Sequence, residues 1–336
     1  SACQLSKMFD RFFKRRNTGL ENSQAISAKQ AIHIDLNELI GLRMQARQLA
    51  FSSQNPSVSL MAGTHVSRFK GRGMDYMESR AYQPGDDIRN MDWRITARTG
   101  KAHVKLFQEE RQRPVIILLD LNPGMFFASE GRFKSVIASQ AAALLAWASL
   151  NQGDRTGGLI INDQHVEIPD HPGKRGVLSF LHQVSLHSNP EQLMQQPELK
   201  EQADNRFSDA IQRLARLARP GSLVFIISDF YQLDRLAEKH LLKIKASSDC
   251  VFIRVLDALE HTPPPSGRYA VTNGVSHGFL DTTDSKQSLN YREWFNSQHS
   301  RLSRLSSKSS IPVVELSTIS QPVEVLRRMF PAKKQR

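Results

Sequence analysis

Apolar residues recur along the last two thirds of the chain in patterns that predict strands alternating with helices. Two runs, Val115–Leu119 and Leu223–Ile227, are apolar throughout, and an acid follows closely after each. Such runs are typical of parallel strands that are buried on both faces of a sheet. Between them, apolar residues recur at helical spacing from Phe133 to Ala148, which predicts a helix with a core-facing stripe.

The same patterns extend through the rest of this region. Strands that alternate with helices favour an α/β fold, here a doubly wound, mostly parallel, Rossmann-type sheet with right-handed crossovers. The length from 115 to 330 suffices for about five or six strands. Further strands are predicted at 157–161, 251–256 and 312–316, with 165–168 pairing on the first and a hairpin over 268–280; further helices are predicted at 174–186, 207–217, 233–244, 291–305 and 323–330.

The first third of the chain has a different pattern. Apolar residues between 35 and 50 follow a helical period, and Asp35 can cap that helix. Glycines and prolines punctuate residues 52–114, which predicts loops and strands rather than helices, with a last strand at 103–107. The sequence therefore predicts a basic helical N-terminal extension at 1–51, a smaller β-rich segment at 52–114 that packs on the sheet, and the α/β domain at 115–336.

Charge is the unusual bulk property of the chain, which has a formal net charge of +12. Residues 1–114 hold 19 basic and 11 acidic side chains, so most of the excess lies in the first third. This positive charge could serve to bind a nucleic acid, an anionic membrane surface or an acidic protein. It could also serve only to keep the protein soluble.

Cysteine content and the lengths of the apolar stretches exclude several classes of protein. The two cysteines, Cys3 and Cys250, provide no disulfide framework and no cysteine-based metal cluster. No apolar stretch approaches the roughly 18 residues of a membrane span, and no secretory signal is visible at the start of the sequence. We therefore expect a soluble, cytoplasmic protein.

Candidate chemistry lies where the two apolar strands end. Asp120 and Asp229 should meet at the carboxyl edge of a parallel sheet, which is where ligands bind in such folds. Two nearby carboxylates repel each other, so this edge favours either a hard cation such as Mg²⁺ or a neighbouring lysine or arginine. The alternative is that both acids only cap the following helices or bind loop amides.

A second cluster of charges occupies residues 71–105, around the turn at Pro84 and Gly85. No histidine or nucleophile stands beside its acids, so an enzymatic role is disfavoured there. Residues of alternating sign at short spacing predict a partly buried ion-pair network that fixes this segment against the sheet domain. Its expected members are Arg80, Asp87, Arg89, Asp92 and Arg98.

This segment resembles the hallmark of a bacterial family, the domain of unknown function 58 (DUF58), which reads R-x-Y-x-x-G-D-D-x-R-x-x-D-W-x-x-x-A-R. The resemblance runs over roughly residues 60–330. It implies a fold similar to the von Willebrand factor type A domain, and a role beside MoxR-type AAA+ ATPases in assembling or maturing other complexes. The matching residues are Arg80, Tyr82, Gly85, Asp86, Asp87, Arg89, Asp92, Trp93, Ala97 and Arg98.

The resemblance also implies where a metal-ion-dependent adhesion site would lie. Its D-x-S-x-S loop begins at Asp120, but Asn122 and Gly124 stand where the serines should be. Asn205 replaces the usual threonine, and Asp229 matches the acid of the third loop. Because three hydroxyls are missing, we expect a degenerate site with no cofactor or a weakly bound Mg²⁺. Many relatives carry hydrophobic segments before the hallmark, and their absence here favours a soluble form.

Three functions follow, in order of preference. The favoured one is a non-enzymatic interaction module whose partners are a MoxR-type AAA+ ATPase and unidentified client proteins. The second is a nucleic-acid-binding protein that uses the basic first third and whose affinity would fall steeply with salt. The last is a metal-dependent hydrolase at Asp120 and Asp229, for which no base or nucleophile is identifiable.

Overall fold

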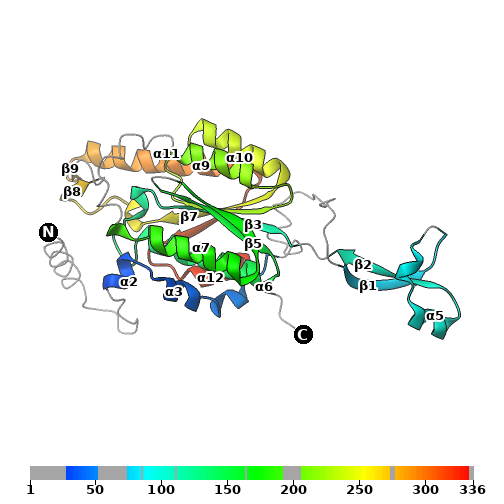
Figure 1. Cartoon of the computed structure of the whole chain (residues 1–336). Helices are drawn as coiled ribbons and strands as arrows, with labels where there is room; N and C mark the ends of the chain where they lie inside the picture. Colours follow the sequence, from blue (N-terminus) through cyan, green and yellow to red (C-terminus); the bar gives the residue numbers. More distant parts are fainter. Residues whose placement is uncertain are drawn as a thin grey trace.

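A six-stranded sheet between two layers of helices forms the body of the protein (Figure 1). The computed structural model describes residues 28–51, 74–84, 86–109, 112–162, 165–191, 206–272 and 277–332. Five strands are parallel, and β5 at one edge is antiparallel to β4. In spatial order the strands are β10 (Val313–Ser317), β7 (Asp249–Leu256), β6 (Leu223–Ser228), β3 (Pro114–Asp120), β4 (Arg155–Ile161) and β5 (Val166–Pro172).

The two apolar runs form the adjacent central strands β3 and β6, which confirms that prediction. Their side chains alternate between the two faces: Ile117 contributes to one buried cluster and Leu118 to the other. Both residues are fully buried. Because helices cover both faces, no position on these strands is left for a polar residue until the carboxyl end is reached.

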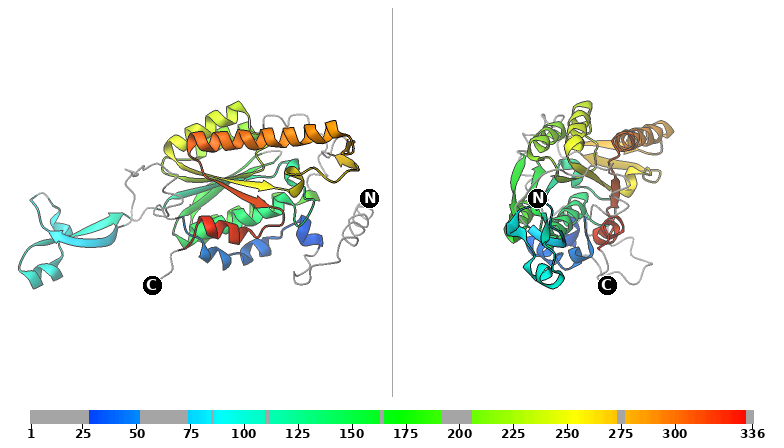
Figure 2. Two further views of the ribbon diagram at one scale, coloured as in Figure 1. Left: turned by 180° about the vertical axis from the view of Figure 1, so that it is seen from behind. Right: turned by 90° about the vertical axis from the view of Figure 1, so that its right-hand side faces the viewer.

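Helices from both halves of the chain build the two layers (Figures 1 and 2). One face carries α6 (Lys134–Asn151), α7 (Gly173–His187) and α12 (Pro322–Met329), with α2 (Ala28–Ile32), α3 (Leu36–Gly41) and the short η1 (Gln45–Gln48) on the same side. The other face carries α9 (Arg206–Leu217), α10 (Arg235–Ser247) and α11 (Ser285–Ser309).

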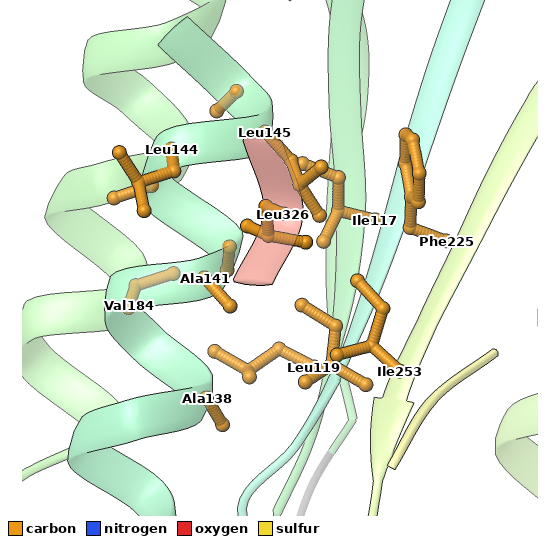
Figure 3. Close-up of a cluster of buried hydrophobic side chains, with 14 of the residues drawn as sticks. Ile117, Leu119, Ala138, Ala141, Leu144, Leu145, Val184, Phe225, Ile253 and Leu326 are labelled. Carbon is orange, nitrogen blue, oxygen red and sulfur yellow. The ribbon is translucent and has the colours of Figure 1, made fainter. Parts of the chain in front are cut away.

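Helix α6 is buried around nearly its whole circumference, not only along one stripe. Figure 3 shows its side chains facing Ile117 and Leu119 of the sheet and Leu326 of α12. On its outer side the indole of Trp147 donates a hydrogen bond to the carbonyl oxygen of Leu39, at 3.0 Å. Residues 28–51 therefore complete the core on this face.

The predicted helix over 35–50 is wrong in length. Helix α3 ends at Gly41, and after a turn only the short η1 follows. The backbone N–H of Ala50 donates to the carbonyl of Phe330, and residue Leu49 forms a β-bridge with Pro331. A continuous helix would have used these backbone groups internally, so the contact with the end of the chain replaces it.

The remaining strands and helices that were predicted for the α/β domain are confirmed, although their ends are shifted. The hairpin consists of β8 (Arg268–Thr272) and β9 (His277–Asp281), and α11 extends beyond its predicted range at both ends. Two short helical turns, η3 (Pro123–Met125) and η6 (Ala258–Glu260), follow β3 and β7. Within the described ranges, no helix is long and apolar enough to cross a membrane.

The hallmark segment forms a separate projection, which we call the arm (residues 74–84 and 86–109). It consists of the antiparallel strands β1 (Met74–Ala81) and β2 (His103–Glu109), the turn η2 (Ile88–Asn90) and helix α5 (Trp93–Thr99). Figures 1 and 2 show it extending from one end of the sheet domain, so the expected packing on the sheet is not seen for the described residues.

The prediction that this segment contains no helix is wrong, although its last strand is confirmed. Helix α5 begins after Asp92, whose carboxylate accepts from the N–H of Ile95, and ends at Gly100, which has a positive φ of 69°. Aspartate is a common residue at the N-cap of a helix, and glycine is common just after its last turn.

Candidate functional site

Three neighbouring strands carry acids to the same edge of the sheet. Asp120 is the last residue of β3, Asp229 follows β6, and Asp257 follows β7. All three are buried. Asp120 and Asp229 interact electrostatically, as expected from the sequence, whereas Asp257 is an addition that the structure reveals.

Both carboxylate oxygens of Asp120 are hydrogen-bonded by the protein itself. One oxygen accepts from the backbone N–H of Asn122 at 2.9 Å, and the other accepts from the hydroxyl of Ser228 at 2.6 Å. Burial, followed by the charge of Asp229, raises the pKa of Asp120 to about 7. Burial and the neighbouring charge therefore favour the protonated form of this carboxyl group.

Asp229 is paired with a buried lysine. The ammonium Nζ of Lys134, in the first turn of α6, lies 2.9 Å from Oδ2 of Asp229 and 2.6 Å from Oε1 of Glu260. The lysine side chain is 1% exposed. The ring of Tyr231 covers the ammonium, with its centroid 5.1 Å from Nζ. One ammonium thus joins the start of α6 to the segments that follow β6 and β7 at the carboxyl edge.

The loop after β6 is held in a strained conformation. Phe230 has a positive φ of 61°, which is unfavourable for a bulky side chain. Its N–H is bonded to the hydroxyl of Ser228, and the N–H of Tyr231 is bonded to Asp229. Phe230 itself packs into the core against Phe252. This arrangement turns Asp229 and Tyr231 toward Lys134.

The positions expected to complete a metal site are only partly suited to it. The side-chain amide of Asn122 donates to Gln232 at 3.2 Å, while its Oδ1 is buried without a hydrogen-bond partner. Gly124 lies beside Asp229: a Cβ on it would be 3.4 Å from Oδ2 of that residue. Asn205 lies outside the described residues. Four of the five predicted positions therefore come together.

The donor set does not fit a divalent cation. Mg²⁺ requires near-octahedral oxygen ligands, of which several can be waters. At this edge Asp120 accepts two hydrogen bonds from the chain, Asp229 accepts the lysine ammonium, and Gly124 contributes no side-chain oxygen. The free Oδ1 of Asn122 is the one ligand atom of this set without a partner. No group of three or more acidic, histidine or cysteine side chains within the described residues could hold a metal.

Sequence reasoning missed Lys134 and Glu260, although each carries a signal. A lysine at the start of an otherwise apolar helix lies at the positive end of the helix dipole, so it needs a carboxylate partner. Glu260 belongs to a capping box with Asp257, visible as D-x-x-E directly after a buried strand. The same rule that selected Asp120 and Asp229, an acid after an apolar run, selects Asp257.

On the arm, the hallmark acids bind local groups. Asp86 pairs with Arg80 at 2.7 Å and accepts from the N–H of Gln83. Asp87 accepts from the N–H of Arg89, and Asp92 accepts from the hydroxyl of Ser79 at 2.7 Å as well as capping α5. These bonds lower the pKa values of Asp86 and Asp92.

The predicted ion-pair network against the sheet domain is therefore wrong. Among the described residues, Arg89 and Arg98 are exposed and form no ion pair, and the one hallmark pair joins Arg80 to Asp86. The acids instead accept hydrogen bonds in turns and helix caps within the arm, and these bonds stabilise its conformation. Gly85 lies outside the described residues.

Apolar side chains are exposed on the same arm. Trp93 is 66% exposed and Ile88 is 62% exposed, while Tyr82 is partly buried and its N–H bonds to the carbonyl of Ala102. Between residues 74 and 109 the sequence has six basic and six acidic residues, so this segment is electrically balanced. The strong basic excess of the first third lies elsewhere.

A surface pocket of about 470 Å³ lies next to α11 and contains none of the predicted site residues. Arg254 is one of its lining residues, and its guanidinium contacts Nδ1 of His299 and lies 3.5 Å from Glu315. The arginine is thus engaged through Nη1 by groups of the chain itself, while its Nε is buried without a hydrogen-bond partner.

Two solved structures are similar over most of their own length. One is the conserved hypothetical protein BatB from Bacteroides thetaiotaomicron, with a TM-score of 0.34 and 14% identity, covering 59% of this chain and 98% of that chain. The other is an aerotolerance-related membrane protein from Bacteroides fragilis NCTC 9343, with a TM-score of 0.39 and 13% identity, covering 65% of this chain and 96% of that chain.

Sequence comparison is more specific. The uncharacterized protein Rv1480 of Mycobacterium tuberculosis is 29% identical over 231 residues, which is 68% of this chain and 70% of that protein. The uncharacterized protein Mb1516 of Mycobacterium bovis matches equally well. The family model described as protein of unknown function DUF58 matches residues 78–303, more than half of the chain. The chain belongs to the DUF58 family.

Proposed function

We propose that this DUF58 protein is a non-enzymatic interaction module that works with a MoxR-type AAA+ ATPase in assembling or maturing a protein complex. The ATPase follows from the resemblance of the hallmark segment. The sheet domain, in this proposal, is similar to a von Willebrand factor type A domain. A cytoplasmic location stays a prediction from the sequence.

The exposed apolar surface of the arm carries the proposal. Trp93 and Ile88 lie on a projecting hairpin whose shape is fixed by its own caps. Exposed tryptophan is costly in water and is enriched among the residues that dominate protein–protein binding. A projecting, internally braced hairpin with such side chains suits insertion into a partner's groove.

The charge balance of the arm favours a protein partner over nucleic acid. Phosphate-driven binding needs an excess of lysine and arginine on the contacting surface, and residues 74–109 have none. A hydrolase is also disfavoured, because at the acidic edge Lys134 and the bonded Asp120 are both buried. Neither offers a free base or nucleophile to a substrate.

The test is direct binding between the full chain and the MoxR-type ATPase of the same host, measured by calorimetry or interferometry. Trp93→Ala should weaken the complex at least about tenfold, the usual size for loss of a dominant contact residue. Phe279→Ala is the matched control, because Phe279 is an aromatic residue of the sheet domain with 65% exposure. It should leave the affinity unchanged.

Two results would overturn the proposal. One is the absence of any complex with the ATPase at micromolar concentrations. The other is a gel-shift experiment in which the chain binds nucleic acid tightly and the affinity falls steeply with salt, since that would identify the basic first third as the working surface.

A further inference from the structure

The acidic edge of the sheet has its own cation. Lys134 brings an ammonium group to Asp229 and Glu260 at hydrogen-bonding distance, and the lysine is buried. Two carboxylates at these distances favour the charged form of the lysine inside the protein.

Its surroundings leave the ammonium no role toward solvent. The carboxylates take two of its donors, and the aromatic face of Tyr231 lies over it, which is a favourable position for a cation. Tyr231 in turn packs on Trp294 and Phe295 of α11, with ring centroids 5.2 and 5.5 Å away. Three aromatic side chains therefore lie on this side of the ammonium.

We infer that the ammonium of Lys134 permanently takes the place of a divalent cation at this edge, and that the site works without metal. The inference rests on the geometry of the edge and is independent of the proposed function. The inference also explains why a lysine lies at the N-terminus of α6, where the helix dipole disfavours a positive charge, because two carboxylates compensate for that unfavourable interaction. A divalent ion beside this ammonium would be strongly repelled.

A consequence concerns partner recognition. An exposed metal ion can bind a carboxylate of a partner protein, because it keeps an open coordination position. A buried lysine whose donors face two internal carboxylates cannot do so. In this inference the ammonium of Lys134 does not bind an acidic side chain of a partner, and it instead holds together the segments that carry Asp229 and Glu260.

The experiment measures metal binding to the full chain. Wild-type protein should show no heat on titration with MnCl₂ or MgCl₂ up to about 10 mM, above the millimolar range of weak cation sites. Its melting temperature should be the same in EDTA and in the metal. Heat in the wild type that disappears in Asp120→Ala would overturn the inference.

A gain-of-binding variant tests the position itself. Lys134→Ala removes the ammonium and leaves the carboxylates of Asp229 and Glu260 beside an open space. With waters as the remaining ligands, Mn²⁺ should now raise the melting temperature by about 4 °C. Adding Asp229→Asn to the same variant should abolish this response. A folded Lys134→Ala protein without a Mn²⁺ response would show that the lysine does not stand at a cation position. If Lys134→Ala fails to fold, the wild-type titration decides alone.

Discussion

The sheet domain and the arm differ in where their apolar side chains lie and in where their polar side chains find hydrogen-bond partners. In the sheet domain, apolar side chains such as Leu118 and Phe225 are buried, and polar groups at the strand ends find partners far away in the chain. In the arm, polar side chains such as Asp87 and Asp92 find their partners within the arm itself, and apolar side chains such as Trp93 remain exposed to solvent. The sheet domain buries its apolar side chains on folding, whereas the arm leaves large apolar side chains exposed, as the proposed function requires.

The largest difference should come from a charge placed in each region. Leu118→Asp puts a carboxylate at a fully buried position of a central strand, which should cost more than about 5 kcal/mol and abolish soluble folded protein. Ile88→Asp on the arm, at a position 62% exposed, should leave expression and melting temperature unchanged. Equal loss of solubility in both variants would break the comparison, as judged by soluble yield and circular dichroism.

The second difference is in the sign of pH dependence. The pKa of Asp120 is raised from 3.8 to about 7, so the stabilisation associated with its protonated form is complete below pH 3.8 and is lost as pH rises toward 7. Asp120→Asn removes this dependence of the free energy of unfolding on pH, because asparagine does not titrate. Relative to wild type, the variant should therefore gain up to about 4 kcal/mol in free energy of unfolding between pH 4 and 8, measured by urea denaturation.

Asp92 on the arm supplies the opposite case. Hydrogen bonds from Ser79 and Ile95 lower its pKa, so its stabilisation is present above the ordinary pKa of 3.8 and is lost as pH falls below it. Asp92→Asn should therefore differ from wild type most at neutral pH and least in acid. Parallel pH profiles for the Asp120 and Asp92 variants would contradict the contrast.

A third difference concerns glycine. A Cβ on Gly158 would lie 2.4 Å from the ring of Phe180 and 2.6 Å from the carbonyl of Ile117, so Gly158→Ala should destabilise the sheet domain by about 3 kcal/mol. Gly100→Ala on the arm meets no neighbouring atom and costs only its left-handed backbone, about 1 kcal/mol. Gly100→Asn should recover part of that cost. Chemical denaturation of all three variants provides the ranking.

The smallest expected effect is the most informative for function. Trp93→Ala removes a large side chain that is 66% exposed, so the free energy of unfolding should change by no more than about 0.5 kcal/mol. A marked fall in melting temperature would instead show that Trp93 packs on the sheet domain in solution. In that case the arm would be a brace, and the loss of partner binding in this variant would need another explanation.

Much of this architecture is encoded locally. Continuous apolar runs identified β3 and β6, and the acids after them identified the edge where Asp120 and Asp229 meet. These features depend on the spacing of residues within one strand or helix, so periodicity alone determines them. The caps of α5 are also local, since Asp92 and Gly100 flank it, although glycine and proline content suggested loops there.

Only the tertiary structure decided that a lysine lies between Asp229 and Glu260. Lys134 is 95 residues from Asp229 and 126 residues from Glu260, and no local pattern couples positions so far apart. The same holds for α6, which is buried on its outer side because residues 28–51 fold back over it. Sequence spacing predicts which face of an element is apolar, but the partner that covers it is determined by long-range packing, which at this edge brings Lys134 to Asp229 and Glu260.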